Sequence, residues 1–267
     1  MTATPNQTAL ITGASQRIGR AIALDLARHG WRVGVHYHRS PEAAQSLAEA
    51  IQQAGSTAVL LEADLAKETE TADLVPRAIE ALGPLDLLVN NASVFELDTM
   101  ATATRQSWDA HMEVNLRAPF VLSQAFAQAF DDAFDDARPS EAGNRTGNII
   151  HLIDQRVWNL TPHFLSYTLS KAGLWALTQT MALALAPRIR VNAIGPGPTL
   201  PSQRQNAEQF ARQAAQMPLG RGTTPEEICA AIRFLLAAPA MTGQMMALDG
   251  GQHLGWAPPP DKPMPCE

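Results

Sequence analysis

The stretch TALITGASQRIG, residues 8–19, decides the fold that this sequence predicts. Its first part, Thr8–Thr12, has the length and apolar character of a buried strand. Residues 18–29 then carry apolar side chains at helical spacing until Gly30 ends the pattern. A turn of small residues between a first strand and a first helix lets backbone N–H groups and the positive helix end face a pyrophosphate. The stretch therefore predicts a dinucleotide-binding turn.

The same alternation of strands and helices continues along the chain. Six more strands are expected, at residues 31–36, 57–61, 85–90, 148–153, 189–194 and 245–248. Helices are expected at 41–54, between the third and fourth strands, at about 105–132, in a segment through Tyr167 and at 225–237. This pattern is typical of an α/β fold, here a single-domain Rossmann-type doubly wound parallel sheet with helices on both faces.

One domain is expected over residues 1–255, because no internal repeat or linker divides the chain. Two segments are predicted to be irregular. Residues 131–147 form an acidic loop, and residues 256–267 form a proline-rich tail, a composition that disfavours regular structure.

Composition excludes several classes of protein. The 267 residues are 46% hydrophobic, enough for an ordinary core, and the formal net charge of −6 disfavours a nucleic-acid partner. Two cysteines, Cys229 and Cys266, argue against a disulfide scaffold. The N-terminus lacks the features of a signal peptide, and no apolar stretch is long enough to span a bilayer. We therefore expect a cytoplasmic protein without a membrane partner.

The end of the second strand indicates which nicotinamide cofactor the turn binds. In NAD-binding folds an acidic residue at this place holds the ribose 2′-hydroxyl. Residues 36–40 are His-Tyr-His-Arg-Ser, without a carboxylate, and Arg39 can clamp a 2′-phosphate bidentately. We therefore predict NADPH rather than NADH. Two histidines at i, i+2 are also a possible metal-ligand pair, but no cysteine or third ligand stands nearby, so no metal is expected.

A tyrosine and a lysine four residues apart are the strongest catalytic signal. The chain has only two tyrosines and three lysines, yet Tyr167 and Lys171 stand at i, i+4, on one face of a helix. A cation beside a phenol lowers the pKa of the tyrosine, so Tyr167 can act as general acid to the atom that gains negative charge when hydride arrives. The alternative is a surface pair without function.

These motifs resemble the short-chain dehydrogenase/reductase family, and several resemble its pteridine reductase branch. The turn at residues 12–19 is similar to the family's TGxxxGxG motif, with Arg17 in place of the middle glycine, as in pteridine reductases. The NNAS sequence at residues 90–93 is similar to the family's NNAG motif, again with the serine of that branch. The resemblance covers about residues 8–255.

The resemblance implies a cofactor site drawn from many parts of the chain. Asp64, after the third strand, is similar to the family's adenine-contacting acid, although it also suits a turn cap. Residues 195–199 resemble the turn whose backbone contacts the cofactor carboxamide. The implied cofactor-binding set is Gly13, Ser15, Arg17, Ile18, Gly19, His36, Tyr37, His38, Arg39, Ser40, Asp64, Leu65, Asn91, Ala92, Ser93, Tyr167, Lys171, Pro196 and Gly197.

Asp154 is a departure from the wider family. It ends the fifth strand, 13 residues before Tyr167, where most members carry a serine that donates to a substrate carbonyl. An ionised aspartate accepts hydrogen bonds and cannot donate them, so it suits a substrate with N–H groups or a ring nitrogen that needs a proton. A pterin offers both, and pteridine reductases carry an aspartate at the matching position. The alternative is an aspartate that makes only local turn bonds.

The same resemblance implies further site residues, each of which also fits an ordinary structural role. Asn115 is similar to the family's asparagine that supports a proton-relay water. Phe95 matches an aromatic ring that stacks over the pterin, and Phe164 is expected to flank the same pocket. The implied catalytic set is Asp154, Tyr167, Lys171 and Asn115, and the substrate-binding set is Arg17, Ser93, Phe95, Asp154, Phe164 and Tyr167.

A substrate lid is expected at about residues 198–218, a polar and glutamine-rich segment. Residues 248–251 resemble the family's C-terminal strand and turn, which often contribute an oligomer contact. The resemblance therefore implies a homotetramer.

The leading functional hypothesis is an NADPH-dependent reductase that transfers hydride to a pteridine ring, either a dihydropterin, an oxidised pterin or dihydrofolate. A carbonyl or 3-oxoacyl reductase of the same family is the first alternative, and Asp154 counts against it. A regulator that binds NADPH without chemistry is the second alternative, and the intact pair of Tyr167 and Lys171 counts against that one.

Overall fold

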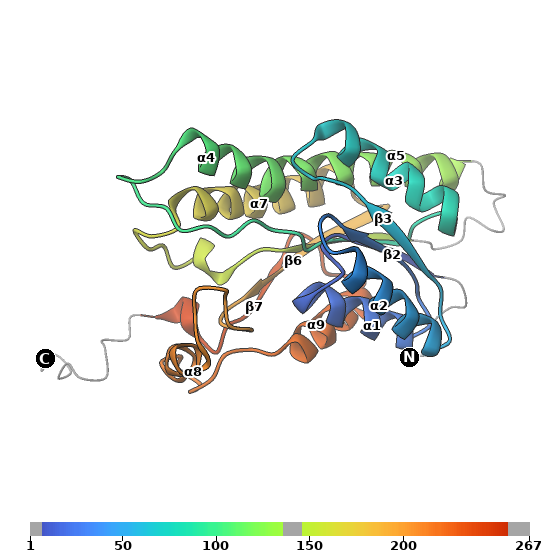
Figure 1. Ribbon diagram of the computed structural model, residues 1–267. Coiled ribbons are helices and arrows are strands. Elements are labelled where there is room, and N and C mark those ends of the chain that lie inside the picture. The colour runs from blue at the N-terminus through green and yellow to red at the C-terminus, as the bar shows by residue number, and fades with distance from the viewer. Residues whose placement is uncertain (1–6, 136–145, 256–267) are drawn as a thin grey trace, which may run out of the picture.

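The structure, a computed structural model, describes residues 7–135 and 146–255 (Figure 1). The predicted tail at 256–267 and residues 136–145 of the predicted loop lie outside the described residues. A single seven-stranded sheet has the order β3-β2-β1-β4-β5-β6-β7, and every neighbouring pair is parallel. Its strands are β1 (Thr8–Ile11), β2 (Arg32–Tyr37), β3 (Ala58–Glu62), β4 (Leu87–Asn90), β5 (Gly147–Leu152), β6 (Ile189–Pro196) and β7 (Met245–Leu248). The predicted Rossmann-type fold is confirmed.

Helices cover both faces of the sheet (Figure 1). One face is covered by α1 (Arg17–Arg28), α2 (Pro41–Gln53) and α9 (Pro225–Ala237). The other is covered by α3 (Glu68–Leu82), α5 (Ala118–Asp135) and α7 (Leu165–Ala184), with α4 (Arg105–Met112) packed beside α7. No helix among the described residues is long and apolar enough to cross a membrane.

The sheet is buried because side chains on both of its faces are apolar. On β1, Ala9 and Ile11 pack against α1, whereas Leu10 between them packs on the opposite face with Leu74 and Phe126. All five side chains are at most 1% exposed. Full burial of a leucine-sized side chain stabilises the fold by about 1.5–3 kcal/mol. Such burial explains why the strands read as continuous apolar runs rather than as alternating ones.

The strand order reverses between β1 and β4, and ligands of open α/β sheets bind outside the carboxyl ends of the strands at such a point. Thr12, just after β1, joins the two chain segments there. Its N–H donates to the Val89 carbonyl (3.0 Å), and its Oγ1 accepts from the N–H groups of Asn91 (2.9 Å) and Ala92 (3.0 Å). The NNAS segment is therefore fixed directly beside the predicted phosphate turn.

Three features differ from the sequence predictions. The helical region predicted at 105–132 is interrupted by a π-helical turn, η1 (Glu113–Arg117). Helix α5 continues through Asp135, so the predicted acidic loop begins later than residue 131. The predicted lid contains a helix, α8 (Ala207–Ala215), whose N-terminus carries a capping box from Asn206 and Gln209.

Candidate active site

The turn after β1 depends on backbone approaches that only glycine permits. Gly13 has φ +61°, and its N–H donates to Nδ1 of His36 (2.9 Å). A Cβ on Gly19 would lie 2.2 Å from the Gly13 carbonyl oxygen and 2.7 Å from Nδ2 of Asn91. No side chain in the described part of the chain caps the start of α1, so the N–H groups of its first turn are available to a ligand. These residues fit the pyrophosphate of a dinucleotide.

Gly19→Ala should destabilise the protein, although alanine is normally favoured over glycine in a helix. The added methyl group would meet a carbonyl and an amide rather than a flexible side-chain end, so we expect a loss of about 1–3 kcal/mol in the free energy of unfolding. NADPH binding should be lost with it. Urea denaturation and a fluorescence titration with NADPH measure the two effects.

Gly55→Ala is the matched control, since nothing lies within 4 Å of its Cβ position and only its φ of +82° opposes alanine. It should cost about 1 kcal/mol and leave cofactor affinity unchanged. A more stable Gly19→Ala protein that still binds NADPH would contradict this account of the turn.

Arg17 occupies the place of a glycine with a left-handed backbone, at φ +52°. This conformation explains why the related motif has glycine there, because a non-glycine residue is strained at positive φ. Its guanidinium crosses to the predicted lid, where Nη1 donates to the Pro201 carbonyl (3.0 Å) and Nη2 to the Leu200 carbonyl (3.3 Å). Arg17 therefore connects the phosphate turn with the lid.

His36 supports the turn from β2. Its Nδ1 accepts from Gly13 and its Nε2 faces the Ala63 carbonyl (3.1 Å), which fixes the neutral tautomer with the proton on Nε2. Burial lowers the pKa of His36 to about 4, so the ring is uncharged at neutral pH. Although His36 lines a cleft, both ring nitrogens are engaged by backbone, so it positions the turn.

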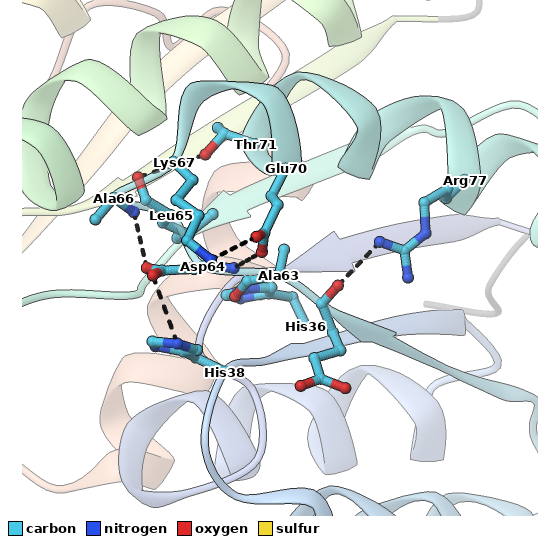
Figure 2. Close-up of polar contacts among 11 residues, drawn as sticks. His36, His38, Ala63, Asp64, Leu65, Ala66, Lys67, Glu70, Thr71 and Arg77 are labelled. Carbon is cyan, nitrogen blue, oxygen red and sulfur yellow. Dashed lines mark hydrogen bonds and ion pairs between the residues drawn. The ribbon is translucent and has the colours of Figure 1, made fainter.

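His38, just after β2, and Asp64, just after β3, face one another (Figure 2), with His38 Nε2 3.7 Å from the Asp64 carboxylate. The other carboxylate oxygen of Asp64 accepts from the Ala66 N–H (3.1 Å), so the side chain caps the turn that follows β3. Asp64 also lines a cleft. Arg39 is exposed and makes no ion pair with any described residue. Within the described ranges, no group of three or more His, Cys, Asp or Glu side chains can hold a metal ion.

Two adjoining clefts, of about 420 and 590 Å³, contain most of the predicted site. They share Arg17, Ile18, Asn91, Ser93 and Val94. The smaller cleft is lined by predicted cofactor residues, namely Gly13, Ser15, Arg17, Ile18, Gly19, His36, Tyr37, His38, Asp64, Leu65, Asn91, Ala92 and Ser93. The larger cleft is lined by Phe95, Asp154, Tyr167, Lys171, Pro196 and Gly197 among others. Four predicted residues line neither cleft: Arg39, Ser40, Asn115 and Phe164.

Asp154, Tyr167 and Lys171 meet in the wall of the larger cleft. The Tyr167 hydroxyl donates to Oδ2 of Asp154 (3.0 Å), while Oδ1 accepts from the Arg156 N–H (2.8 Å). Lys171 Nζ donates to the Leu152 carbonyl (2.8 Å) and lies 5.8 Å from the Tyr167 ring centre. The phenol is thus hydrogen-bonded directly to the carboxylate, and the ammonium lies close to the same ring.

The prediction that Lys171 lowers the pKa of Tyr167 is wrong for this arrangement. Burial, followed by the charge and hydrogen bond of Asp154, raises the pKa of Tyr167 well above its usual value. Burial also raises the pKa of the Asp154 carboxyl, against opposing effects of the Arg156 N–H and charge. Burial and a carboxylate in direct contact therefore outweigh the opposing charge of Arg156 at the phenol.

Turnover should fall at alkaline pH because Lys171 loses its charge. Burial lowers the pKa of Lys171 to about 8, and Asp154 opposes the shift. Below that pH the ammonium can stabilise negative charge at the reaction centre, and above it the amine is neutral. We expect kcat/KM to fall about tenfold per pH unit above pH 8. A pH series of NADPH oxidation measures the profile.

Lys67→Met is the matched control for this profile, since Lys67 is an exposed lysine that pairs with Glu70 at 2.9 Å. It should leave the alkaline limb in place. A wild-type profile that stays flat up to pH 10 would contradict the role of Lys171.

Asn115 lies in the π-helical turn, and its side chain is fully engaged by protein. Its Oδ1 accepts from the N–H of Val94 (2.8 Å) and from Ser93 Oγ (3.2 Å). Its Nδ2 donates to the Val94 carbonyl (2.9 Å) and to Ser170 Oγ (3.1 Å). Asn115 therefore ties the NNAS segment to α7, and its role in a water relay stays a prediction.

Phe95 forms an aromatic wall beside Tyr167. The two rings meet edge to face with centres 4.6 Å apart, and Phe164 stacks on Phe95 at 4.5 Å with an interplanar angle of 9°. Phe164 itself has φ +59° and lies outside the cleft lining, so it supports Phe95 rather than flanking the pocket directly as predicted. The Arg204 guanidinium lies 5.0 Å from the centre of the Phe95 ring.

A buried polar network that the sequence analysis missed holds this wall in place. His111 Nε2 accepts from the Glu96 N–H (3.1 Å), and its Nδ1 contacts Ser166 Oγ (2.7 Å). Ser166 donates in turn to the Asp98 carboxylate, which also accepts from Ser107 Oγ (3.2 Å). The network joins the segment that carries Phe95 to the start of α7. Its members are too far apart in the sequence to form a recognisable motif.

Comparisons with known proteins agree with this geometry. The model of the enoyl-(acyl carrier protein) reductase family matches residues 13–253. A 3-oxoacyl-[acyl-carrier-protein] reductase from Synechocystis sp. is 33% identical, over 94% of this chain and 98% of the relative.

Solved structures give the same result. FolM alternative dihydrofolate reductase 1 from Brucella suis, in complex with NADP, is 44% identical, with a TM-score of 0.87 over 97% of this chain and 99% of that one. A double mutant of a Serratia marcescens short-chain dehydrogenase/reductase is 31% identical, with a TM-score of 0.82 over 92% of this chain and 98% of that one. The chain therefore belongs to the short-chain dehydrogenase/reductase family and is similar to its pteridine reductase-like branch.

Proposed function

We propose that this oxidoreductase uses NADPH to reduce the ring of a pteridine, such as a dihydropterin. The observation that carries the proposal is the 3.0 Å hydrogen bond from the Tyr167 hydroxyl to Asp154 Oδ2 in the wall of the larger cleft. Burial and Asp154 raise the pKa of Tyr167, so the phenol keeps its proton at the point where a substrate atom must take one up.

This pair suits a ring nitrogen better than a carbonyl oxygen. The nicotinamide, when bound, supplies hydride to the ring carbon, and the neighbouring nitrogen then needs a proton. The Tyr167 hydroxyl, which donates its hydrogen bond to Asp154, carries a proton that can pass to this nitrogen. A carboxylate would instead repel the negative charge that grows on a carbonyl oxygen. It can also accept hydrogen bonds from the amino group of a pterin.

NADPH is the cofactor in this proposal. Residues 36–40 contain no carboxylate that would repel a 2′-phosphate, and His38 and Arg39 are both exposed at the end of β2. The similar Brucella suis protein was crystallised with NADP. We expect the exposed Arg39 to contact the phosphate once the cofactor binds.

Arg39→Asp should weaken the preference for NADPH over NADH. Loss of a charge-assisted hydrogen bond raises Kd by about 10–100-fold, and the new carboxylate adds repulsion. We expect the Kd for NADPH to rise by at least tenfold while the Kd for NADH stays within about threefold. Fluorescence titration gives both values. Arg28→Asp, at the far end of α1, is the control. Equal changes for the two cofactors would argue against a 2′-phosphate contact.

The proposed reaction is tested by NADPH oxidation with biopterin, dihydrobiopterin, dihydromonapterin and dihydrofolate, with the products identified by chromatography. We expect turnover of at least one reduced pteridine to the tetrahydro form. Absence of both turnover and binding with every pteridine would refute the proposal. NADPH binding without turnover of any substrate would instead favour the regulator. A homotetramer remains the expectation for the assembly.

A 3-oxoacyl reductase is the second candidate, favoured by the 33% identity to the Synechocystis enzyme. Asp154 in the cleft wall opposes it, since a carboxylate cannot donate to the substrate carbonyl. Turnover of 3-oxoacyl thioesters, in preference to pteridines, would favour the 3-oxoacyl reductase over the pteridine reductase.

A further inference from the structure

The rim of the larger cleft carries an excess of positive charge. Apart from the catalytic group, three arginines line this cleft, Arg17, Arg156 and Arg204, against one carboxylate, Glu96. A pteridine ring itself needs no such charge. The excess positive charge is therefore expected to act on the substituent that projects from the pteridine ring.

Two of these arginines are already occupied. Arg17 donates to two carbonyls of the lid at 3.0 and 3.3 Å. Arg204 lies 3.3 Å from the Glu96 carboxylate and also donates to the Phe95 carbonyl (3.1 Å). Their contacts hold the lid and the aromatic wall together.

Arg156 differs from the other two. Among the described residues, its guanidinium has one hydrogen-bond partner, Thr161 Oγ1, at 2.7 Å from Nη1, and no carboxylate forms an ion pair with it. Its Nε is buried without a partner. The buried Nε is closed to a ligand, but the guanidinium lines the cleft and makes a hydrogen bond only through Nη1 to the described residues, so its outer N–H groups can take an acceptor.

Arg156 is also close to the reaction centre. It stands two residues after Asp154, and its charge lowers the pKa values of Asp154 and Tyr167 against the larger effects that raise them. Its guanidinium lies 5.0 Å from the centre of the Phe164 ring, which stacks at 4.5 Å on Phe95, the neighbour of Tyr167 at 4.6 Å. Because Tyr167 and Arg156 also line the same cleft, one ligand with a substituent can contact both.

We infer that Arg156 is the centre of an anion subsite, with Arg204 at its edge, for an acidic group on the pteridine substituent. The inference rests on the proposed function and deepens it. The preferred substrate is a reduced pteridine whose side chain ends in a carboxylate or a phosphate, rather than one with a neutral polyol side chain. The anion would pair with the guanidinium by charge-assisted hydrogen bonds.

The test compares substrates that share the ring and differ in the charge of the side chain. The probes are dihydrofolate for a carboxylate, dihydroneopterin phosphate for a phosphate and dihydrobiopterin for a neutral side chain. For Arg156→Gln we expect KM to rise at least tenfold for the anionic probe that wild type prefers, and to stay within twofold for dihydrobiopterin. Arg156→Lys should recover part of the loss.

Two readouts separate the subsite from an indirect effect on catalysis. A change in kcat shared by all probes would reflect the influence of Arg156 on Asp154, whereas a change in KM confined to anionic probes reports the subsite. Calorimetric titration of folate into the NADP⁺ complex should show the same loss of affinity without turnover. Arg105→Gln, at an arginine that is 88% exposed on α4, is the control for a lost surface charge.

Equal kcat/KM values of wild type for neutral and anionic probes would overturn the subsite and leave the proposed function standing. A uniform rise in KM for all probes in Arg156→Gln would do the same. Failure of wild type to reduce any pteridine would overturn both. A preference for the carboxylate or for the phosphate probe identifies which anion the subsite takes.

Discussion

Replacing Tyr167 by phenylalanine is expected to reduce turnover by about 100- to 10,000-fold, the usual contribution of a general acid. The substitution removes the one hydroxyl that donates to Asp154 Oδ2 and leaves the ring, which packs edge to face on Phe95. Steady-state NADPH oxidation measures the loss. The Kd for NADPH should stay within a few-fold, because the phenyl ring still fills the same space.

Thr180→Val is the matched control for Tyr167→Phe. It removes a hydroxyl from the exposed face of the same helix, where the only partner of the Thr180 hydroxyl within residues 7–135 and 146–255 is the Ala176 carbonyl (3.0 Å). Its turnover should equal that of wild type, and thermal denaturation of both variants checks that α7 is intact. Undiminished turnover in Tyr167→Phe would show that the proton comes from another group.

Replacing Asp154 by serine is expected to exchange one substrate class for another. Pteridine reduction should fall at least 100-fold in kcat/KM, because the carboxylate that accepts from the Tyr167 hydroxyl and from the amino group of the pterin is lost. Reduction of a keto ester should rise from near zero, because a serine hydroxyl can donate to a carbonyl oxygen. NADPH oxidation with both substrates measures the exchange.

The same variant should change the ionisation of Tyr167. The charge and hydrogen bond of Asp154 help to raise the pKa of Tyr167, so removing the carboxylate should move that pKa downward. Absorbance titration of the phenol in wild type and Asp154→Ser tests the sign. Asp154→Asn, which keeps the shape and removes the charge, should show the same direction. An unchanged or higher tyrosine pKa would contradict the coupling of the two groups.

Much of the fold was predictable because its signals are local. The apolar run at Thr8–Ile11 and the helix at Pro225–Ala237 follow from periodicity, and both occur where expected. The glycines at 13 and 19 follow from the geometry of a strand–turn–helix unit, which tolerates no Cβ at those points. The helix α8 was missed because its sequence is polar, and its Asn206–Gln209 capping box is a signal that could have identified it.

The electrostatics of the site were harder to predict, because they depend on contacts between distant residues. The sequence spacing predicted that Lys171 and Tyr167 lie one turn apart on a helix. The raised pKa of the tyrosine comes instead from burial and from a carboxylate on another element. Likewise, nothing in the sequence around Arg156 indicates that its Nε is buried without a partner. Helix position can be read from spacing, whereas desolvation is a property of the packed protein.

The most direct measurement of the central claim is a competition between a dihydropterin and a 3-oxoacyl thioester in one mixture with limiting NADPH. The ratio of the two products equals the ratio of kcat/KM weighted by concentration. The contact between Asp154 and Tyr167 predicts that the tetrahydropterin dominates by at least 100-fold at equal substrate concentrations. Equal amounts of the two products, or an excess of the hydroxyacyl thioester, would contradict it.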